Sequence, residues 1–169
     1  PFCKSRCPYC AFYFVVGREE KQAAAVDAVV REIAVRTHDA RFAGRRVFLT
    51  GHTGFKGSWL SLWLGRLGAE VTGFALPPAT KPSLFDQAGI AAGLRHIEGD
   101  VRDAAAIEAA LGECKPDFIF HLAAQPLVLE SYAAPAETFA TNVTGSINLM
   151  EAIRRSGTRA AVVMVTTDK

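Results

Sequence analysis

No apolar stretch of this 169-residue sequence approaches the length that crosses a lipid bilayer, because Arg66 and Glu70 interrupt the richest one, residues 59–76. A basic segment followed by an apolar run and a cleavage site is also missing, so no secretory leader is expected. These two absences predict a protein without membrane contact and with a cytoplasmic location.

Charge of one sign is equally scarce. The formal net charge is +2, and the adjacent arginines at 45–46 and 154–155 are isolated pairs rather than parts of a basic stripe. A basic surface is the footprint of a nucleic-acid-binding protein, so no nucleic-acid partner is predicted. Half of the residues are hydrophobic and 21% are charged, which is typical of a globular α/β protein with a core of its own. Internal repeats and low-complexity stretches are absent.

Cysteine is confined almost entirely to the start of the chain. Three of the four cysteines, Cys3, Cys7 and Cys10, lie within the first ten residues with C-x3-C-x2-C spacing. In a reducing compartment such clustering favours metal over disulfides, and three thiolates can hold three irons of a [4Fe-4S] cluster. A zinc site with a fourth ligand from His38, His52 or Cys114, or simply free thiols, are the alternatives.

The segment around these cysteines, from Pro1 to about Thr37, resembles the radical SAM enzymes, particularly their oxygen-independent coproporphyrinogen oxidase-like branch. The resemblance implies a [4Fe-4S] cluster whose open iron binds S-adenosylmethionine. Residues 1–40 are therefore expected to form a cysteine loop and a helix, a fragment appended to a second domain at 41–169. Residues 38–44 show no periodicity and are predicted to be a linker.

From Arg45 onward, apolar strand-like runs alternate with helical patterns, which predicts a doubly wound parallel sheet of the Rossmann type. Right-handed crossovers give the strand order 3-2-1-4-5. Strands are expected at residues 47–50, 71–76, 95–98, 118–122 and 161–166. Helices are expected at 54–67, 103–111 and 136–155, with Pro135 in the first turn of the last one. Five apolar residues at helical spacing in that last helix are predicted to lie in the core: Phe139, Val143, Ile147, Met150 and Ile153.

The first of these strands runs into Thr50-Gly51-His52-Thr53-Gly54-Phe55-Lys56-Gly57 and then into a helix. Glycines at this bend let the backbone turn tightly and approach a pyrophosphate, which then rests on the positive end of the helix. The order of strand, glycine loop and helix predicts a dinucleotide site, and a glycine-rich turn without a ligand is the alternative. The loop residues expected to bind the cofactor are Gly51, Thr53, Gly54, Phe55, Lys56 and Gly57.

Ligands of open α/β sheets bind beyond the carboxyl ends of the strands, so the other strand ends complete the predicted site. Asp100 could accept a hydrogen bond from the adenine amino group, whereas Asp103 is expected to cap the next helix. Ala123 and Ala124 leave room for the nicotinamide ribose. His121 is interpreted as a satisfied core histidine in preference to a catalytic one. Val101, Leu122 and Thr141 complete the expected cofactor contacts.

The ends of the second and the last predicted strands differ in the polar groups that they present to a ligand. The second strand ends in Ala75-Leu76-Pro77-Pro78, without the carboxylate that commonly holds the adenosine ribose, so this position does not choose between NAD and NADP. The last strand ends in Thr167-Asp168-Lys169, whose hydroxyl, carboxylate and ammonium are predicted to face the nicotinamide and the substrate. An ordinary polar strand terminus is the alternative.

Five strings of the sequence are similar to those of the CDP-glucose 4,6-dehydratases, members of the extended short-chain dehydrogenase/reductase superfamily. They are residues 51–60 (GHTGFKGSWL), 82–85 (PSLF), 121–128 (HLAAQPLV), 141–143 (TNV) and 165–169 (VTTDK). The resemblance runs from about Phe42 to Lys169. It implies bound NAD, a nucleotide-sugar substrate (CDP-glucose) and a homo-oligomer for the full-length family. It also implies that Thr167 hydrogen-bonds the C4 oxygen, that Asp168 is the acid for the C6 hydroxyl, and that Lys169 replaces the glutamate of related dTDP-glucose enzymes.

Two departures from this family limit what the chain is expected to do. Leu129 and Glu130 follow Gln-Pro-Leu-Val where the family usually has arginine. The Tyr-x-x-x-Lys pair of the superfamily is also missing, because Tyr9, Tyr13 and Tyr132 have no lysine four residues later. We therefore expect the cofactor-binding half of a dehydratase, truncated and inactive alone. A radical SAM protein with a nucleotide-binding domain and a non-catalytic NAD-binding fragment are the other hypotheses, and a junction of two gene fragments would explain both resemblances.

Overall fold

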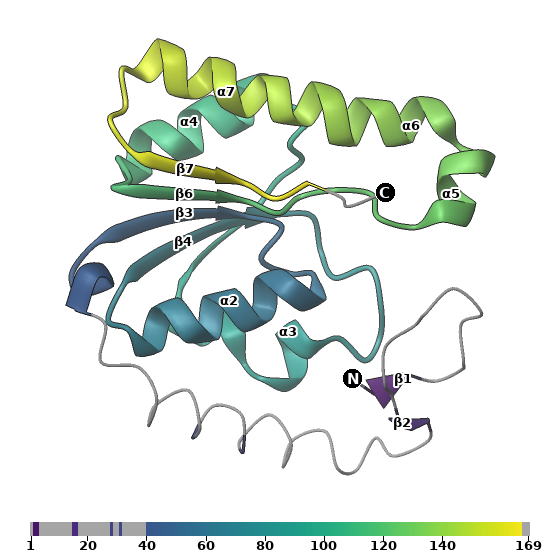
Figure 1. Cartoon of the computed structure of the whole chain (residues 1–169), viewed down its shortest axis with the longest axis horizontal. Helices are drawn as coiled ribbons and strands as arrows, with labels where there is room; N and C mark the ends of the chain where they lie inside the picture. The colour runs from purple at the N-terminus through teal and green to yellow at the C-terminus, as the bar shows by residue number, and fades with distance from the viewer. Residues whose placement is uncertain (1, 4–14, 17–27, 29–30, 32–39, 167–169) are drawn as a thin grey trace.

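The computed structural model describes residues 2–3, 15–16, 28, 31 and 40–166 (Figure 1). At the start of the chain, β1 (Phe2–Cys3) pairs in parallel with β2 (Val15–Val16). Of the predicted cluster ligands, Cys7 and Cys10 lie outside the described residues, as do Thr167, Asp168 and Lys169.

Five parallel strands form the central sheet, in the order β5-β4-β3-β6-β7. Numbered by their place in this sheet, the order is 3-2-1-4-5, as predicted. Each strand begins and ends within two residues of its predicted bounds, because short apolar runs between turn residues are read reliably in a buried parallel sheet. The strands are β3 (Arg46–Thr50), β4 (Glu70–Ala75), β5 (Arg95–Glu98), β6 (Phe118–His121) and β7 (Ala161–Met164).

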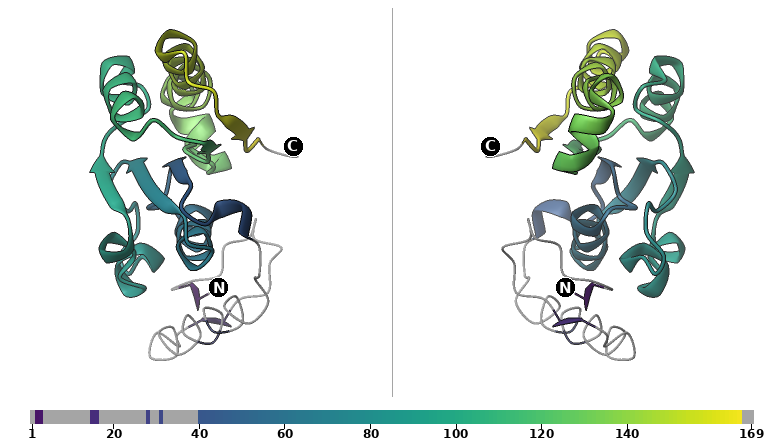
Figure 2. Two further views of the ribbon diagram at one scale, coloured as in Figure 1. Left: turned by 90° about the vertical axis from the view of Figure 1, so that its left-hand side faces the viewer. Right: turned by 90° about the vertical axis from the view of Figure 1, so that its right-hand side faces the viewer.

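Helices cover both faces of the sheet (Figures 1 and 2). The side chains of the central strand alternate between these faces: Phe48 packs toward the α4 and α7 side, while Val47 and Leu49 join Leu64 on the α2 side. The sheet thus sits between two apolar cores. One face carries α2 (Phe55–Arg66), α3 (Leu84–Gln87) and the 3-10 turn η3 (Ile90–Gly93), and the other carries α4 (Ala104–Cys114) and α7 (Gly145–Ser156).

The predicted helix over residues 136–155 is three consecutive helical segments. It follows α5 (Val128–Ala133) and consists of α6 (Pro135–Phe139), the π-helical turn η4 (Ala140–Thr144) and α7. Pro135 stands in the first turn of α6, as predicted. The π turn holds one more residue per turn than an α-helix, so it rotates the side chains that follow it relative to those before it.

The prediction that the apolar stripe of this helix lies in the core is wrong for four of its five residues. The side chains of Phe139, Val143, Ile147 and Met150 are each about half exposed or more among the described residues. The buried face of α7 consists of Gly145, Leu149 and Ala152, with Ile153 partly buried beside them. Leu149 and Ala152 share a core cluster with Ile107, Ala110 and Leu111 of α4. Gly145 lets the start of α7 approach the turn after β5, since a Cβ on it would lie 2.6 Å from a methyl group of Val101.

The predicted linker at residues 38–44 is also wrong where the structure describes it. Residues Ala40–Phe42 form the 3-10 turn η2, and the Phe42 ring lies 4.9 Å from the Phe118 ring, centroid to centroid. The Gly44 N–H donates to the carbonyl of Gly68, at 2.9 Å. Phe42 therefore belongs to the α2-side core, which the absence of periodicity in so short a segment could not reveal. Among the described helices, none is both long and apolar enough to cross a membrane.

Candidate functional site at the carboxyl edge of the sheet

The loop between β3 and α2 needs glycine at both of its ends. Gly51 has a φ of +74°, and a Cβ there would lie 2.7 Å from the Ala123 nitrogen at the end of β6. A Cβ on Gly57 would lie 2.1 Å from the Gly51 carbonyl oxygen, so the first turn of α2 packs directly on the loop backbone. The glycine spacing thus sets a tight bend whose amides are uncovered by side chains.

The N-terminus of α2 has no side-chain cap among the described residues. Its N-cap is Gly54, whereas Asp103 caps α4 by accepting from the amides of Ala105 and Ala106, both at 3.0 Å. Ser83 likewise caps α3. The first turn of α2 contains no acidic residue, so its N–H groups and the positive end of the helix dipole remain available to an anion. A diphosphate is the ligand that such a loop and helix end fit.

Hydrogen bonds fasten this loop to the neighbouring strand β4. The Gly51 N–H donates to the Phe74 carbonyl at 3.0 Å, and the Thr53 hydroxyl donates to the Leu76 carbonyl at 2.8 Å. On the helix side, the Ser58 hydroxyl donates to the His52 carbonyl at 3.1 Å. The bend is therefore held in place before any ligand arrives, and the side chain of Thr53 is committed to this structural role.

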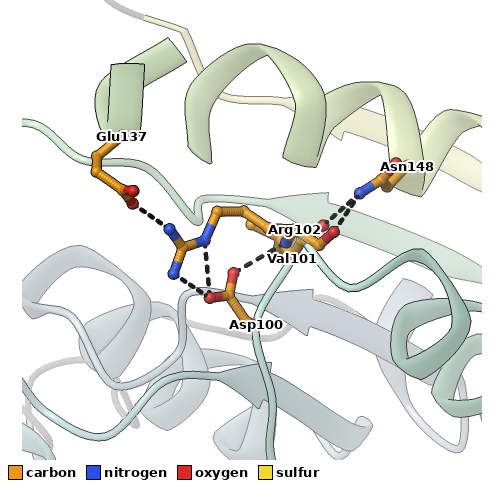
Figure 3. Close-up of polar contacts among 5 residues, drawn as sticks. All are labelled: Asp100, Val101, Arg102, Glu137 and Asn148. Carbon is orange, nitrogen blue, oxygen red and sulfur yellow. Dashed lines mark hydrogen bonds and ion pairs between the residues drawn. The ribbon is translucent and has the colours of Figure 1, made fainter. Parts of the chain in front are cut away.

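Asp100, the predicted adenine ligand, follows β5 and accepts several hydrogen bonds from an arginine (Figure 3). Arg102 donates to its Oδ2 from Nε at 2.8 Å and from Nη2 at 2.6 Å, and the Arg102 amide donates to Oδ1 at 2.9 Å. The same guanidinium also bonds Glu137 on α6. Hydrogen bonding by Arg102 lowers the pKa of Asp100, so this side chain is an ionised acceptor fixed in orientation.

Val101 is buried, so only its backbone can meet a ligand. Its carbonyl and that of Arg102 both accept from the Nδ2 amide of Asn148 on α7, each at 3.0 Å (Figure 3). The turn after β5 is thereby tied to α7 as well as to α6, and the N–H of Val101 is the backbone group left for its predicted cofactor contact.

The predicted cofactor contacts after β6 are Leu122 and, at the nicotinamide ribose, Ala123 and Ala124. Two of their amides converge on the hydroxyl of Thr50. Thr50 Oγ1 accepts from the amides of Leu122 and Ala123, both at 3.2 Å. Ala123 also faces Gly51, as the close approach described above requires. The ends of β3 and β6, the two middle strands at the topological switch point, therefore meet through backbone atoms and small side chains.

His121 is a buried histidine with a partner at each ring nitrogen, as predicted. Its Nδ1 lies 2.7 Å from Thr50 Oγ1, and its Nε2 lies 3.0 Å from Ser146 Oγ. The Ser146 hydroxyl donates its single hydrogen to the Asn142 carbonyl at 2.7 Å, so it must accept from Nε2–H. Nδ1 then carries the lone pair that accepts from Thr50. Burial lowers the pKa of His121, which agrees with this neutral form.

Thr141 lies half-buried in the π turn η4, beside Asn142. The Asn142 side chain accepts from the Gln125 amide at 2.7 Å and donates to the Gln125 carbonyl at 3.1 Å. The loop after β6 is thus pinned to the π turn, and turns of this kind are frequent at functional sites. Among the described residues, the Thr141 hydroxyl has no hydrogen-bond partner.

The alternatives for a fourth zinc ligand lie apart from one another where the structure describes them. No cluster of three potential metal ligands occurs among the described residues. Cys114 is buried in the core on the α4 side, while His52 lies against Phe85 of α3, on the other face. They were alternatives for the fourth zinc ligand beside the three N-terminal cysteines, two of which lie outside the described residues, so the zinc interpretation stays a prediction.

Four polar residues of this edge were missed from the sequence: Thr50, Arg102, Asn142 and Ser146. Only Arg102 carried a usable signal, because an arginine two residues after a loop aspartate can fold back on it. The other three meet their partners across strand and helix boundaries.

The family model described as GDP-mannose 4,6-dehydratase matches residues 48–169. Among curated proteins, the CDP-glucose 4,6-dehydratase of Salmonella typhimurium is 50% identical over 126 residues, which cover 75% of this chain and 35% of that protein. The chain thus spans about a third of the length of this relative.

Solved structures show the same arrangement. A UDP-glucose 4-epimerase from Stenotrophomonas maltophila, with bound NAD and formylated UDP-arabinopyranose, has a TM-score of 0.65 and 26% identity, over 73% of this chain and 37% of its own. The Thermus thermophilus UDP-glucose 4-epimerase in complex with NAD has a TM-score of 0.60 and 32% identity, over 68% of this chain and 35% of its own. With its five-stranded Rossmann sheet and its match over residues 48–169, the chain belongs to the sugar-nucleotide 4,6-dehydratase and epimerase family that the GDP-mannose 4,6-dehydratase model describes.

Proposed function

We propose that this chain is the NAD-binding part of a sugar-nucleotide 4,6-dehydratase whose substrate is CDP-glucose. The observation that carries the NAD proposal is the uncapped N-terminus of α2 behind a bend that needs glycine at positions 51 and 57. The choice of CDP-glucose is supported by the 50% identity to a curated CDP-glucose 4,6-dehydratase. NAD in the related epimerase structures adds support for the cofactor.

In this proposal the cofactor lies along the carboxyl edge of the sheet. The amides of Phe55, Lys56 and Gly57 hold the diphosphate, behind the bend made by Gly51 and braced by Thr53. The Gly54 N–H closes this bend by donating to the Gly51 carbonyl at 3.1 Å. The Asp100 carboxylate and the Val101 N–H receive the adenine, and Leu122, Ala123, Ala124 and Thr141 line the nicotinamide ribose. Asp100 suits this role because Arg102 keeps it ionised and oriented without covering it, its side chain being 23% exposed.

Bound NAD would supply the acceptor for the hydride of C4 of the glucose ring and the donor that returns it to C6. Water is lost across C5 and C6 between these transfers. The residues proposed for this chemistry are Thr167 at the C4 oxygen, Asp168 as acid for the C6 hydroxyl, and Lys169 beside the C5 proton. They follow β7 in the sequence and lie outside the described residues.

We further propose that the chain cannot turn over substrate alone. The superfamily's tyrosine base and the lysine that lowers its pKa have no counterpart in the sequence. For residues 1–169 on their own, binding of NAD without turnover is therefore the activity that we propose. Formation of a 4-keto sugar from CDP-glucose by the isolated chain would contradict this part.

Calorimetric titration with NAD tests the cofactor site, and Gly54→Asp sharpens the test. Gly54 has φ −74° and ψ 167°, which any residue adopts, and its Cβ would meet only the Gly51 oxygen, at 3.4 Å. Aspartate is a favoured N-cap, so it should leave the fold as stable or more stable by a few tenths of a kcal/mol. Its charge would occupy the helix end and repel the diphosphate, weakening NAD binding by about 100-fold.

Gly65→Ala is the matched control, since it lies near the other end of α2 with open space around it. It should leave NAD affinity unchanged. If Gly54→Asp bound NAD as tightly as the parent protein, the diphosphate would lie elsewhere and the proposal would fail.

The iron–sulfur interpretation of Cys3, Cys7 and Cys10 stays a prediction from the sequence. Anaerobic reconstitution with iron and sulfide followed by an absorbance spectrum tests it, with Cys10→Ser as the control. A charge-transfer band near that of other [4Fe-4S] proteins, lost in the variant, is the expected result. A colourless protein would leave free thiols as the better description.

A further inference from the structure

His52, in the middle of the glycine loop, turns its side chain away from the predicted ligand and into the protein. The side chain is fully buried, and its Nε2 lies 2.7 Å from Nδ1 of His96 on β5. The two rings are 4.9 Å apart, centroid to centroid, at an interplanar angle of 64°. His96 itself is exposed to solvent. The loop after β3 is thereby joined by a side-chain hydrogen bond to the strand two places away in the sheet.

The surroundings of His52 are shaped for this ring. Gly73 stands mid-strand in β4, a position where glycine costs stability, and a Cβ there would lie 2.4 Å from the His52 ring. Phe85 of α3 covers the same ring edge-on at 5.5 Å. Gly73 is also the residue paired with His96 in the sheet register, so the missing side chain opens the path between the two histidines.

The backbone of His52 is part of the candidate diphosphate loop. Its carbonyl accepts from Ser58 in the first turn of α2, and its Cα would lie 2.7 Å from a Cβ on Gly57. A shift of the His52 backbone would therefore move both the bend and the start of the helix. The hydrogen bonds of Gly51 and Thr53 reach β4 and the residue directly after it, Leu76, but not β5.

We propose that His52 is the positioning residue of the dinucleotide loop, and that its hydrogen bond to His96 holds the amides of residues 55–57 in the arrangement that binds the diphosphate. This inference rests on the proposed function for its ligand and adds a residue pair that touches no ligand itself. His52 acts by fixing where the backbone of the loop lies, with β5 as the anchor.

The pair can be broken without disturbing the buried ring. Because His96 uses Nδ1 and is exposed, His96→Asn places an amide group at nearly the same point and keeps the hydrogen bond, whereas His96→Leu removes it. Arg95→Leu is the matched control: it changes the adjacent residue of β5, whose side chain bonds Glu113 of α4 on the other face of the sheet. Arg95 belongs to no part of the candidate site.

The experiment measures two quantities for the full chain and these three variants: NAD affinity by calorimetry, and hydrogen exchange of the Gly51, Gly54 and Ser58 amides relative to that of Leu49 in β3. His96→Leu should weaken NAD binding about fivefold and speed exchange of the loop amides by a similar factor, the scale of one part-buried hydrogen bond. His96→Asn should retain most of both, and Arg95→Leu should retain all.

Three other outcomes would contradict the positioning role of His52 or the proposed function. A His96→Leu protein that melts at a lower temperature but keeps parental NAD affinity and loop exchange would reduce the pair to a stabilising contact and overturn the proposal. Equal loss in His96→Asn and His96→Leu would overturn the role of the hydrogen bond. If the parent chain bound no NAD while His96→Leu still speeded loop exchange, the positioning would stand and the proposed function would fail.

Discussion

The hydroxyl of Thr50 lies 2.7 Å from Nδ1 of His121, which is 71 residues further along the chain. This contact joins the ends of β3 and β6, the two strands on either side of the topological switch point of the sheet. The same hydroxyl accepts from the amides of Leu122 and Ala123, so one side chain organises the end of β6 beneath the candidate nicotinamide site.

Removal of the Thr50 hydroxyl should lower the free energy of unfolding by more than the loss of a single hydrogen bond would. Thr50→Val keeps the shape but leaves the Ala123 amide and His121 Nδ1 buried without a partner. We expect the free energy of unfolding in urea to fall by about 2 to 3 kcal/mol, the penalty of stranded polar groups. Thr80→Val, at an exposed position, is the control and should change it by less than about 0.5 kcal/mol. Equal effects of the two substitutions would contradict the network.

Stability should fall as the pH drops from about 6.5 to about 4. Burial, and to a lesser extent the nearby His96, lower the pKa of His52 to about 4 from its ordinary 6.5. Between these values the unfolded chain binds a proton that the folded protein refuses, so acid favours unfolding, and the effect levels off below pH 4. It amounts to roughly 2 to 3 kcal/mol for this residue.

His52→Gln removes that titration while placing an amide near the position of Nε2. The difference in unfolding free energy between the parent and this variant should therefore shrink as the pH is lowered from 7.5 to 4.5. Parallel pH profiles of the two proteins would show that His52 is protonated in the folded state as readily as in the unfolded chain.

Two glycines of α2 should respond to alanine with opposite signs. Gly57→Ala forces a Cβ to within 2.1 Å of the Gly51 oxygen, so the helix must move off the loop. We expect a loss of more than about 2 kcal/mol of stability and weaker NAD binding. Gly65→Ala meets no neighbour and should stabilise the helix by about 0.5 to 1 kcal/mol. Thermal melting of both variants measures the contrast, and destabilisation by both would contradict the packing described.

Arg102 should control the ionisation of Asp100 more than it controls stability. In Arg102→Met the pKa of Asp100 is expected to rise toward its ordinary value, because the fork that favours the carboxylate is gone. Both groups are partly exposed, so the unfolding free energy should change by less than about 1 kcal/mol. NMR titration of the Asp100 carboxyl carbon reports the pKa.

Glu137→Gln provides the comparison, since it removes the second carboxylate from Arg102 and leaves the fork to Asp100 intact. It should leave the pKa of Asp100 low. An Asp100 pKa that stayed low in Arg102→Met would show that the carboxylate is stabilised by other groups.

The strands and their order were predictable because each is a short apolar run between turn residues, and the right-handed crossover leaves few ways to arrange five of them. The glycine loop was predictable for the same local reason, since its bend requires residues without a Cβ. Asp103 as the cap of α4 follows from a hydrogen bond that reaches only three residues along the chain.

The face of the last helix was not predictable in this way. The stripe from Phe139 to Met150 has helical spacing, yet the π turn at Ala140–Thr144 and the close contact with α4 bury Gly145, Leu149 and Ala152 instead. Periodicity identifies an apolar face, but the shape of the neighbouring helix selects which side of the chain lies against it.

Residue order alone determined the sheet, the order of its strands and the glycine bend of the candidate site, because these depend on apolar periodicity and on where a Cβ is tolerated. Tertiary structure decided the polar pairs that hold this edge together: Thr50 with His121, His52 with His96, and Asp100 with Arg102 and Glu137. Their partners come from different strands and helices, and a hydrogen bond forms only between atoms that the completed fold has brought within about 3 Å of each other.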